Sequence, residues 1–132
     1  MSLRDATIAQ ILVPVDDLDR GIAFYRDVLG LPFLFAAPPA MAFFECGGMR
    51  LLVGVPPEGQ EAQRGSTIYF RVADIGAVHS SLRAAGVSFL AEPHVVHRTA
   101  SAQLWLAEFR DPFGNVLPLL AELAADDERH AG

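Results

Sequence analysis

The hydrophobic pattern of the chain occurs twice, in residues 10–18 and again in residues 67–75. In both segments apolar side chains alternate with other residues, namely Ile11, Val13 and Val15 in the first and Ile68, Phe70 and Val72 in the second. A period of two is typical of a half-buried β-strand. The repeat therefore predicts two similar modules, each starting with a strand.

A helix is predicted after each of these strands, because the apolar spacing changes to three or four residues. An aspartate that can cap the helix comes first, Asp17 in one module and Asp74 in the other. The apolar faces of the two helices consist of Leu18, Ile22, Tyr25 and Leu29, and of Ile75, Val78, Leu82 and Ala85. Each helix is expected to end at a glycine, Gly30 or Gly86.

Further strands complete each module, so that both read β-α-β-β-β. They are expected near residues 31–35, 42–46 and 50–55, and near residues 87–90, 103–110 and 115–120. The 132 residues are interpreted as one α+β domain. Its parts are module one at about 7–55, a linker at 56–65, module two at about 66–122 and a polar tail at 123–132. The two modules would form a curved sheet around a central cavity.

The period of two also predicts which side chains face that cavity. If Val13 and Val15 lie beneath the helix, Gln10 points to the other side. By the same alternation Thr67 and Tyr69 point into the cavity from the second module. Gln10 is then a polar residue in an otherwise apolar strand, and it is expected to face the cavity.

Composition narrows the classes of function. Apolar residues make up 52% of the chain and Cys46 is its one cysteine, which excludes an internal disulfide. The first residues lack the pattern of a signal peptide, so a soluble, cytoplasmic protein without a membrane segment is expected. The net charge is −6 and all ten basic residues are scattered arginines, which argues against nucleic-acid binding. The acidic surplus weakly favours a cationic ligand.

Two segments resemble a known family. Residues 15–30, with the sequence Val-Asp-Asp-Leu-Asp-Arg-Gly-Ile-Ala-Phe-Tyr-Arg-Asp-Val-Leu-Gly, resemble the first-module signature of the vicinal oxygen chelate superfamily. The turn at 109–115, Phe-Arg-Asp-Pro-Phe-Gly-Asn, resembles its second-module signature. That superfamily includes glyoxalase I, bleomycin-resistance proteins, extradiol dioxygenases and methylmalonyl-CoA epimerases. The resemblance covers roughly residues 7–122 and indicates the fold, whereas the function stays open.

The resemblance also implies where a metal would be held. In the enzymes of the family, His, Gln or Glu side chains from the first and last strands of each module bind a divalent ion. The matching positions here are Gln10, Leu52, Thr67 and Pro118. Leu52 and Pro118 have no donor atom and Thr67 is a poor ligand, so no metal cofactor is predicted. An atypical divalent-metal site built from Gln10, His94 and a glutamate stays as the alternative.

The remaining candidates are the histidines, Trp105 and Cys46. His79 and His130 are expected to be solvated, and His94 and His97 to lie in a loop, with His94 at the cavity rim. Trp105 is either a core residue or a surface on which a flat ligand stacks. Cys46 is expected to be an inert, half-buried thiol.

Three functions remain after this reasoning. The first is a metal-free protein resembling the bleomycin-resistance branch, a homodimer that binds a small aromatic or amphipathic compound in its cavity. Its predicted ligand-binding residues are Gln10, Leu52, Thr67, Tyr69, His94, Trp105 and Pro118. The second is a metal-dependent lyase, isomerase or dioxygenase of the glyoxalase-like group. The third is a domain whose cavity is filled by its own side chains.

Overall fold

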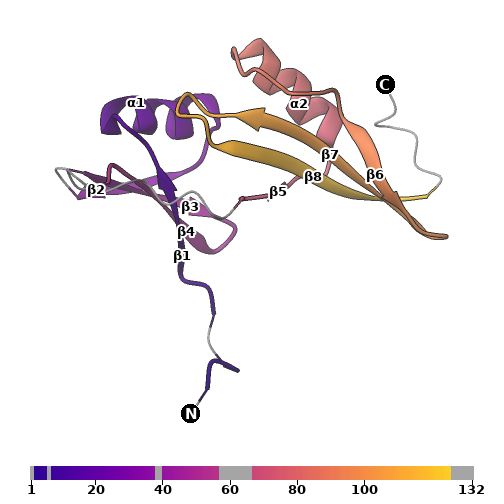
Figure 1. The fold of residues 1–132 in the computed structure, drawn as a ribbon, viewed down its shortest axis with the longest axis horizontal. Helices are drawn as coiled ribbons and strands as arrows, with labels where there is room; N and C mark the ends of the chain where they lie inside the picture. Colours follow the sequence, from indigo (N-terminus) through magenta and orange to yellow (C-terminus); the bar gives the residue numbers. More distant parts are fainter. Residues whose placement is uncertain (1, 6, 38–39, 57–66, 126–132) are drawn as a thin grey trace. The chain divides into compact units, whose positions relative to one another are not determined.

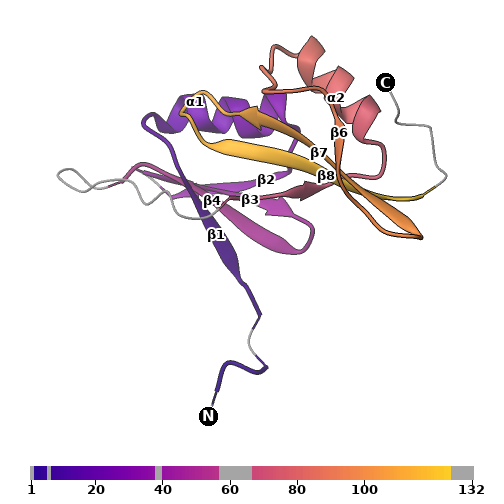
Figure 2. The same ribbon diagram turned by 45° about the vertical axis from the view of Figure 1, so that its right-hand side comes forward.

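The computed structural model of the protein describes residues 2–5, 7–37, 40–56 and 67–125. The chain divides into two compact units, Met1–Arg64 and Gly65–Gly132, which are described separately. In each unit a four-stranded mixed sheet has a helical segment lying against one of its faces (Figures 1 and 2). The predicted α+β fold of two β-α-β-β-β modules is therefore confirmed.

The first unit contains four strands, and its helical segment follows the first of them. The elements in chain order are β1 (Gln10–Pro14), α1 (Leu18–Ile22), the π-helical segment η1 (Ala23–Val28), β2 (Phe33–Ala37), β3 (Met41–Cys46) and β4 (Met49–Gly54). The strand order in the sheet is β1-β4-β3-β2, with β1 parallel to β4 and the other pairs antiparallel.

The first helix begins where the sequence predicts. The Asp17 carboxylate accepts a hydrogen bond from the backbone N–H of Arg20 at 3.0 Å, which caps one of the free donors of the first turn. A Cβ atom on Gly21 would lie only 3.0 Å from Cγ1 of Val53 and 3.3 Å from Cγ2 of Val15. The absence of a side chain at Gly21 therefore lets α1 pack closely on β4 and the end of β1.

The second unit repeats this order. Its elements are β5 (Phe70–Arg71), α2 (Ile75–Ala84), β6 (His94–Arg98), β7 (Ala102–Arg110) and β8 (Val116–Ala124), and the strand order is β5-β8-β7-β6. The Asp74 carboxylate accepts from the N–H of Ala77 at 3.0 Å, so this predicted cap is also confirmed.

The structure differs from the predicted strands in module two. Residues 87–90 form only a single bridge, between Phe89 and Phe109. The strand forms instead at His94–Arg98, directly after Pro93, where the sequence predicts a loop. This prediction was wrong because β6 lies at the edge of its sheet, where a proline before the first strand residue removes no necessary hydrogen bond. Valines at 95 and 96 then favour the extended chain.

The ends of module two also differ from the predicted boundaries. Strand β5 has only two residues, and β8 continues to Ala124, into the segment predicted as tail. Leu123 is 7% exposed there, so the apolar alternation of β8 extends beyond residue 122. Of the predicted linker at 56–65, only Pro56 belongs to the described residues. Most of the predicted tail, residues 126–132 with His130, also lies outside them.

Candidate functional site

The face of the first sheet opposite α1 carries exposed apolar side chains, and we call it the open face of the first sheet. One row of residues crosses it in register, consisting of Leu12, Leu52, Phe43 and Phe35. Leu12 is 48% exposed and Phe35 is 45% exposed. The alternate residues Val13 and Phe44 are buried on the other face, as the period of two predicts.

A polar row lies beside this apolar row. Gln10, Arg50 and Glu45 are in register on β1, β4 and β3, and Gln10 and Arg50 are exposed. The Cζ atom of Arg50 lies 5.3 Å from the ring centroid of Phe43 and 5.8 Å from that of Phe35. The two rings stack on each other at 4.6 Å with an interplanar angle of 28°. The open face of the first sheet therefore carries a stacked aromatic pair, exposed at Phe35 and buried at Phe43, with a cation over it.

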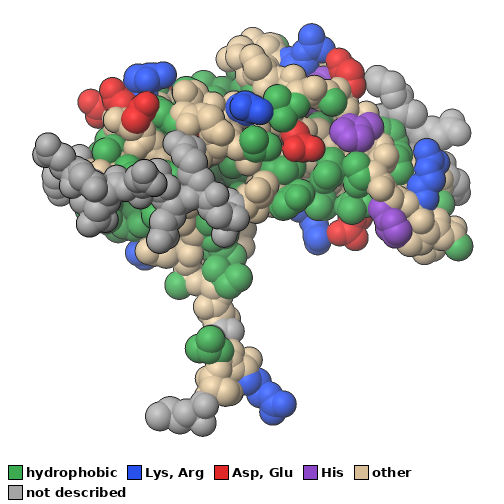
Figure 3. Space-filling model, viewed as in Figure 1, with side chains coloured by type: hydrophobic (Ala, Val, Ile, Leu, Met, Phe, Trp, Pro, Cys, Tyr) green, Lys and Arg blue, Asp and Glu red, His purple; other side chains and the backbone are tan. Residues whose placement is uncertain are grey.

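The open face of the second sheet, opposite α2, carries the two histidines of β6. His94 pairs with Leu106 and His97 pairs with Leu104, with a register shift between Val95 and His97. In a regular strand, residues three apart point to opposite faces, but this bulge places both histidines on one face. Figure 3 shows histidine side chains at the surface of this unit among hydrophobic ones. His94 also has its Nδ1 2.8 Å from the carbonyl oxygen of Glu92.

The other predicted ligand-binding residues of the second unit do not share one surface, since some are exposed and others are buried. Thr67 and Tyr69 precede β5 and are exposed, Tyr69 at 54%. Pro118 pairs with Glu108 on the open face of the second sheet and is fully buried. Trp105 lies on the opposite face, beneath α2, where it is 7% exposed and donates from Nε1 to Oε1 of Gln103 at 3.1 Å. Its position fits the core interpretation of this side chain better than the stacking interpretation.

Two of the four positions implied for a metal lack a donor atom. Gln10 and Leu52 share the open face of the first sheet, but the direct neighbour of Gln10 on β4 is Arg50, a cation. Leu52 and Pro118 are hydrocarbon side chains and offer no lone pair to an ion. Across residues 2–5, 7–37, 40–56 and 67–125, no three His, Cys, Asp or Glu side chains gather into a group that could hold a metal ion.

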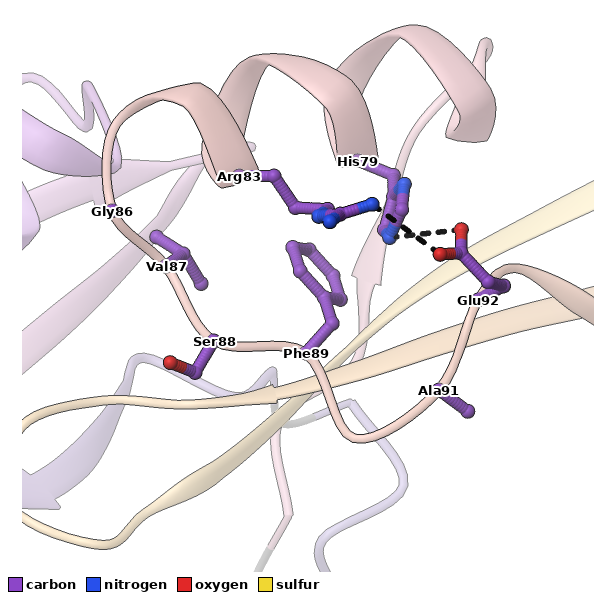
Figure 4. Close-up of a pocket in the computed structure, with 8 residues that line it drawn as sticks. All are labelled: His79, Arg83, Gly86, Val87, Ser88, Phe89, Ala91 and Glu92. Atoms are coloured by element: carbon purple, nitrogen blue, oxygen red, sulfur yellow. Dashed lines mark hydrogen bonds and ion pairs between the residues drawn. The ribbon is translucent and has the colours of Figure 1, made fainter.

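A pocket with a volume of about 570 Å³ lies between α2 and the loop that follows it, and His79 is one of the residues that line it (Figure 4). His79 was predicted to be solvated, and this is wrong, since it is only 5% exposed. Its ring packs edge-on against Phe89 with the centroids 4.3 Å apart. Glu92 lies 3.6 Å from Nε2 of His79 and 3.3 Å from Nη1 of Arg83. These contacts attach the loop after α2 to the helix, which is a structural role.

The single cysteine lies at the end of β3. Burial raises the pKa of the Cys46 thiol, and the negative charge of Glu45 raises it further. A thiol with a raised pKa carries little thiolate at neutral pH, and the thiolate is the reactive form. The environment of Cys46 therefore agrees with the inert thiol expected from the sequence.

Arg50 is the residue of the open face that sequence reasoning missed. Its position two residues before Leu52 on a predicted strand was enough to place both side chains on the same face. The scattered distribution of the arginines counts against a nucleic-acid surface and carries no information on a single arginine. Arg50 lies over one exposed ring, Phe35, and one buried ring, Phe43, an arrangement that needs no cluster of arginines.

Comparisons with known proteins agree with this fold. The family model for the Glyoxalase/Bleomycin resistance protein/Dioxygenase superfamily matches residues 7–119. A lactoylglutathione lyase from Agrobacterium tumefaciens is 26% identical, with a TM-score of 0.69 over 88% of this chain and 93% of that one. No curated protein matches the chain.

Two more distant structures share the fold alone. A superfamily member from Sphaerobacter thermophilus is 21% identical with a TM-score of 0.70, covering 88% of this chain and 97% of that one. Another, from Alicyclobacillus acidocaldarius, is 15% identical with a TM-score of 0.71 and covers 96% of this chain and 97% of that one.

Within the described part of the chain, no helix has the length and apolarity needed to cross a membrane. The resemblance noted in the sequence is thus confirmed, and the chain belongs to the Glyoxalase/Bleomycin resistance protein/Dioxygenase superfamily.

Proposed function

We propose that this member of the superfamily binds a small aromatic or amphipathic compound on the open face of its first sheet. The observation that carries the proposal is the exposure of large apolar side chains there: Leu12 at 48%, Phe35 at 45% and Met41 at 41%. Covering apolar surface contributes about 25 cal/mol for each Å² removed from water. A contiguous apolar surface rimmed by polar residues is typical of a ligand site.

The proposal includes binding without a metal ion. The resemblance implies metal donors at four positions, and two of those positions are Leu52 and Pro118, which have no donor atom. A divalent ion needs a complete and well-oriented set of ligands to compete with water. Gln10 alone does not supply such a set.

A homodimer is part of the same proposal. It follows from the resemblance to the bleomycin-resistance branch, and the edge strand β2 supports it, because its apolar side chains Phe33 and Leu34 are 37% and 46% exposed. An exposed apolar edge strand is a surface on which a second chain can pair. The proposal extends to a soluble protein of the cytoplasm.

The second candidate is a metal-dependent enzyme of the glyoxalase-like group. The observation that favours it is the 26% identity to a protein named lactoylglutathione lyase. Titration of the purified protein with Ni²⁺ and Zn²⁺ distinguishes the two candidates. Stoichiometric binding would support the enzyme, and the absence of saturable binding would support the metal-free site.

Leu12→Ser tests the proposed ligand surface. The neutral dye N-phenyl-1-naphthylamine, which brightens in apolar surroundings, is expected to bind the wild-type protein saturably. Loss of the leucine side chain is expected to weaken this binding by about fivefold, because roughly 1 kcal/mol of apolar contact disappears. Fluorescence titration measures the affinity.

The matched control is Val96→Ser on β6. Val96 is 46% exposed, close to the 48% of Leu12, and lies in the other unit. Its replacement is expected to leave dye affinity unchanged. Treatment with EDTA is expected to change nothing either. Absence of saturable dye binding to the wild-type protein would contradict the proposal and support a domain filled by its own side chains.

A further inference from the structure

Arg50 combines aromatic stacking with an exposed position. Its guanidinium is positioned over two aromatic rings, at 5.3 Å from the centroid of Phe43 and 5.8 Å from that of Phe35. It is exposed, and no carboxylate in the described part of the chain forms an ion pair with it. The cation is thus held in place by stacking while its N–H donors remain available.

The nearest acidic side chain is engaged elsewhere. Glu45 is in register with Arg50 across β3 and β4, on the same face of the sheet. Its Oε1 accepts a hydrogen bond from the backbone N–H of Gly48 at 2.8 Å, which holds the carboxylate toward the turn between the strands. The cross-strand partner that would ordinarily neutralise Arg50 therefore supports the turn instead.

Arg26 provides a comparison within the same unit. Its Cζ lies 6.0 Å from the ring centroid of Phe33, so it too is positioned over an aromatic ring. Arg26, however, pairs with Asp27, whose oxygen lies 2.8 Å from Nε, and this pairing lowers the pKa of Asp27. Of the two arginines stacked on phenylalanine in the first unit, Arg50 is the one without an ion-pair partner among the described residues.

We propose that Arg50 is an anion-recognition residue, so that the ligand of this face is a planar aromatic compound carrying a carboxylate or a similar oxyanion. This inference rests on the proposed function and adds the charge of the ligand to it. The apolar row with Leu12 and Leu52 holds the ring, and the adjacent polar row with Gln10 and Arg50 holds the oxyanion. A guanidinium suits a carboxylate because its planar fork can donate two parallel hydrogen bonds.

The acidic net charge of −6 does not oppose this assignment. At physiological ionic strength charges more than about 8 Å apart are largely screened, so an anion next to Arg50 responds chiefly to that guanidinium. The net charge weakly favours a cationic ligand, but the nearby guanidinium of Arg50 favours an anionic one, and at short range the guanidinium dominates.

The test compares 2-naphthoate with 2-naphthamide, which have the same ring and nearly the same shape but differ in charge. Isothermal titration calorimetry of the full chain is expected to give about tenfold tighter binding of the naphthoate, the usual effect of a charge-assisted hydrogen bond. Arg50→Gln removes the charge and is expected to abolish this preference while naphthamide still binds. Circular dichroism verifies that the variant is folded.

Arg98→Gln is the matched control, since it removes one positive charge from an exposed arginine on β6. It is expected to retain the preference for naphthoate. Equal affinities of the wild-type protein for the two probes, or a preference that persists in Arg50→Gln, would overturn the inference and leave the proposed function intact. Binding of neither probe would overturn both.

Discussion

Replacing Asp111 by alanine is expected to lower the free energy of unfolding by about 3 kcal/mol, because three buried or part-buried donors lose their acceptor at once. Asp111 is 5% exposed. Its Oδ1 accepts from the backbone N–H groups of Phe113 at 2.9 Å and Asn115 at 2.8 Å, and its Oδ2 accepts from Nδ2 of Asn115 at 2.6 Å. Urea unfolding followed by circular dichroism measures the loss.

Two further variants separate the turn from general effects of charge. Asp111→Asn keeps one oxygen for the backbone donors and is expected to lose about half as much stability. Asp27→Ala removes an exposed carboxylate and is expected to change stability by less than about 0.5 kcal/mol. A loss below about 1 kcal/mol in Asp111→Ala would contradict the role assigned to this turn.

Replacing Phe44 by alanine is expected to lower the free energy of unfolding by about 4 kcal/mol, the typical cost of removing a fully buried phenylalanine. Phe44 has no exposed surface, and its ring lies 5.5 Å from that of Phe33 and 6.1 Å from that of Tyr25. It occupies the face of β3 that packs beneath the helical segment of the first unit. The same unfolding measurement applies.

Phe35→Ala is the counterpart on the open face. Phe35 is 45% exposed and is expected to cost only about 1 kcal/mol of stability on truncation. It stacks on Phe43, however, so its loss is expected to weaken naphthamide binding by about tenfold. Equal losses of stability in Phe44→Ala and Phe35→Ala would contradict the division of the sheet into a core face and a binding face. Unchanged naphthamide binding in Phe35→Ala would contradict it as well.

Local patterns predicted the module repeat because each pattern has a direct physical cause. The alternation around Val13 and Val15 predicts a strand with one buried face, and both residues are 2–3% exposed. Asp17 and Asp74 predict the helix starts because only a short polar side chain reaches the free N–H groups of the first turn. The motif at 109–115 has a physical cause as well, because the Asp111 carboxylate accepts hydrogen bonds from the backbone of the turn between β7 and β8.

Features that depend on sheet context could not be predicted in this way. Whether Pro93 excludes a strand depends on whether that strand is at an edge, which is a property of the assembled sheet. His79 appeared solvated because histidine is often exposed on helices, yet the loop after α2 brings Phe89 against its ring. The two histidines of β6 share a face only because of the bulge between Val95 and His97.

The sequence predicts two residues of the candidate site, Gln10 and Leu52, but not Arg50. Gln10 and Leu52 were assigned from a family pattern, and the open face of the first sheet does bring them onto one surface. Arg50 was missed because its significance comes from the stacked rings of Phe35 and Phe43, which belong to other strands. A cation over an aromatic pair is visible only once the cross-strand register is known.

Two-dimensional NMR of the backbone amides tests most directly whether 2-naphthamide binds on the open face of the first sheet. The signals of Gln10, Leu12, Phe35 and Leu52 are expected to shift saturably with the probe, because these residues form adjoining rows on the open face of the first sheet. Shifts centred on His79 and the pocket between α2 and the loop that follows it, or no saturable shifts at all, would contradict binding on this face.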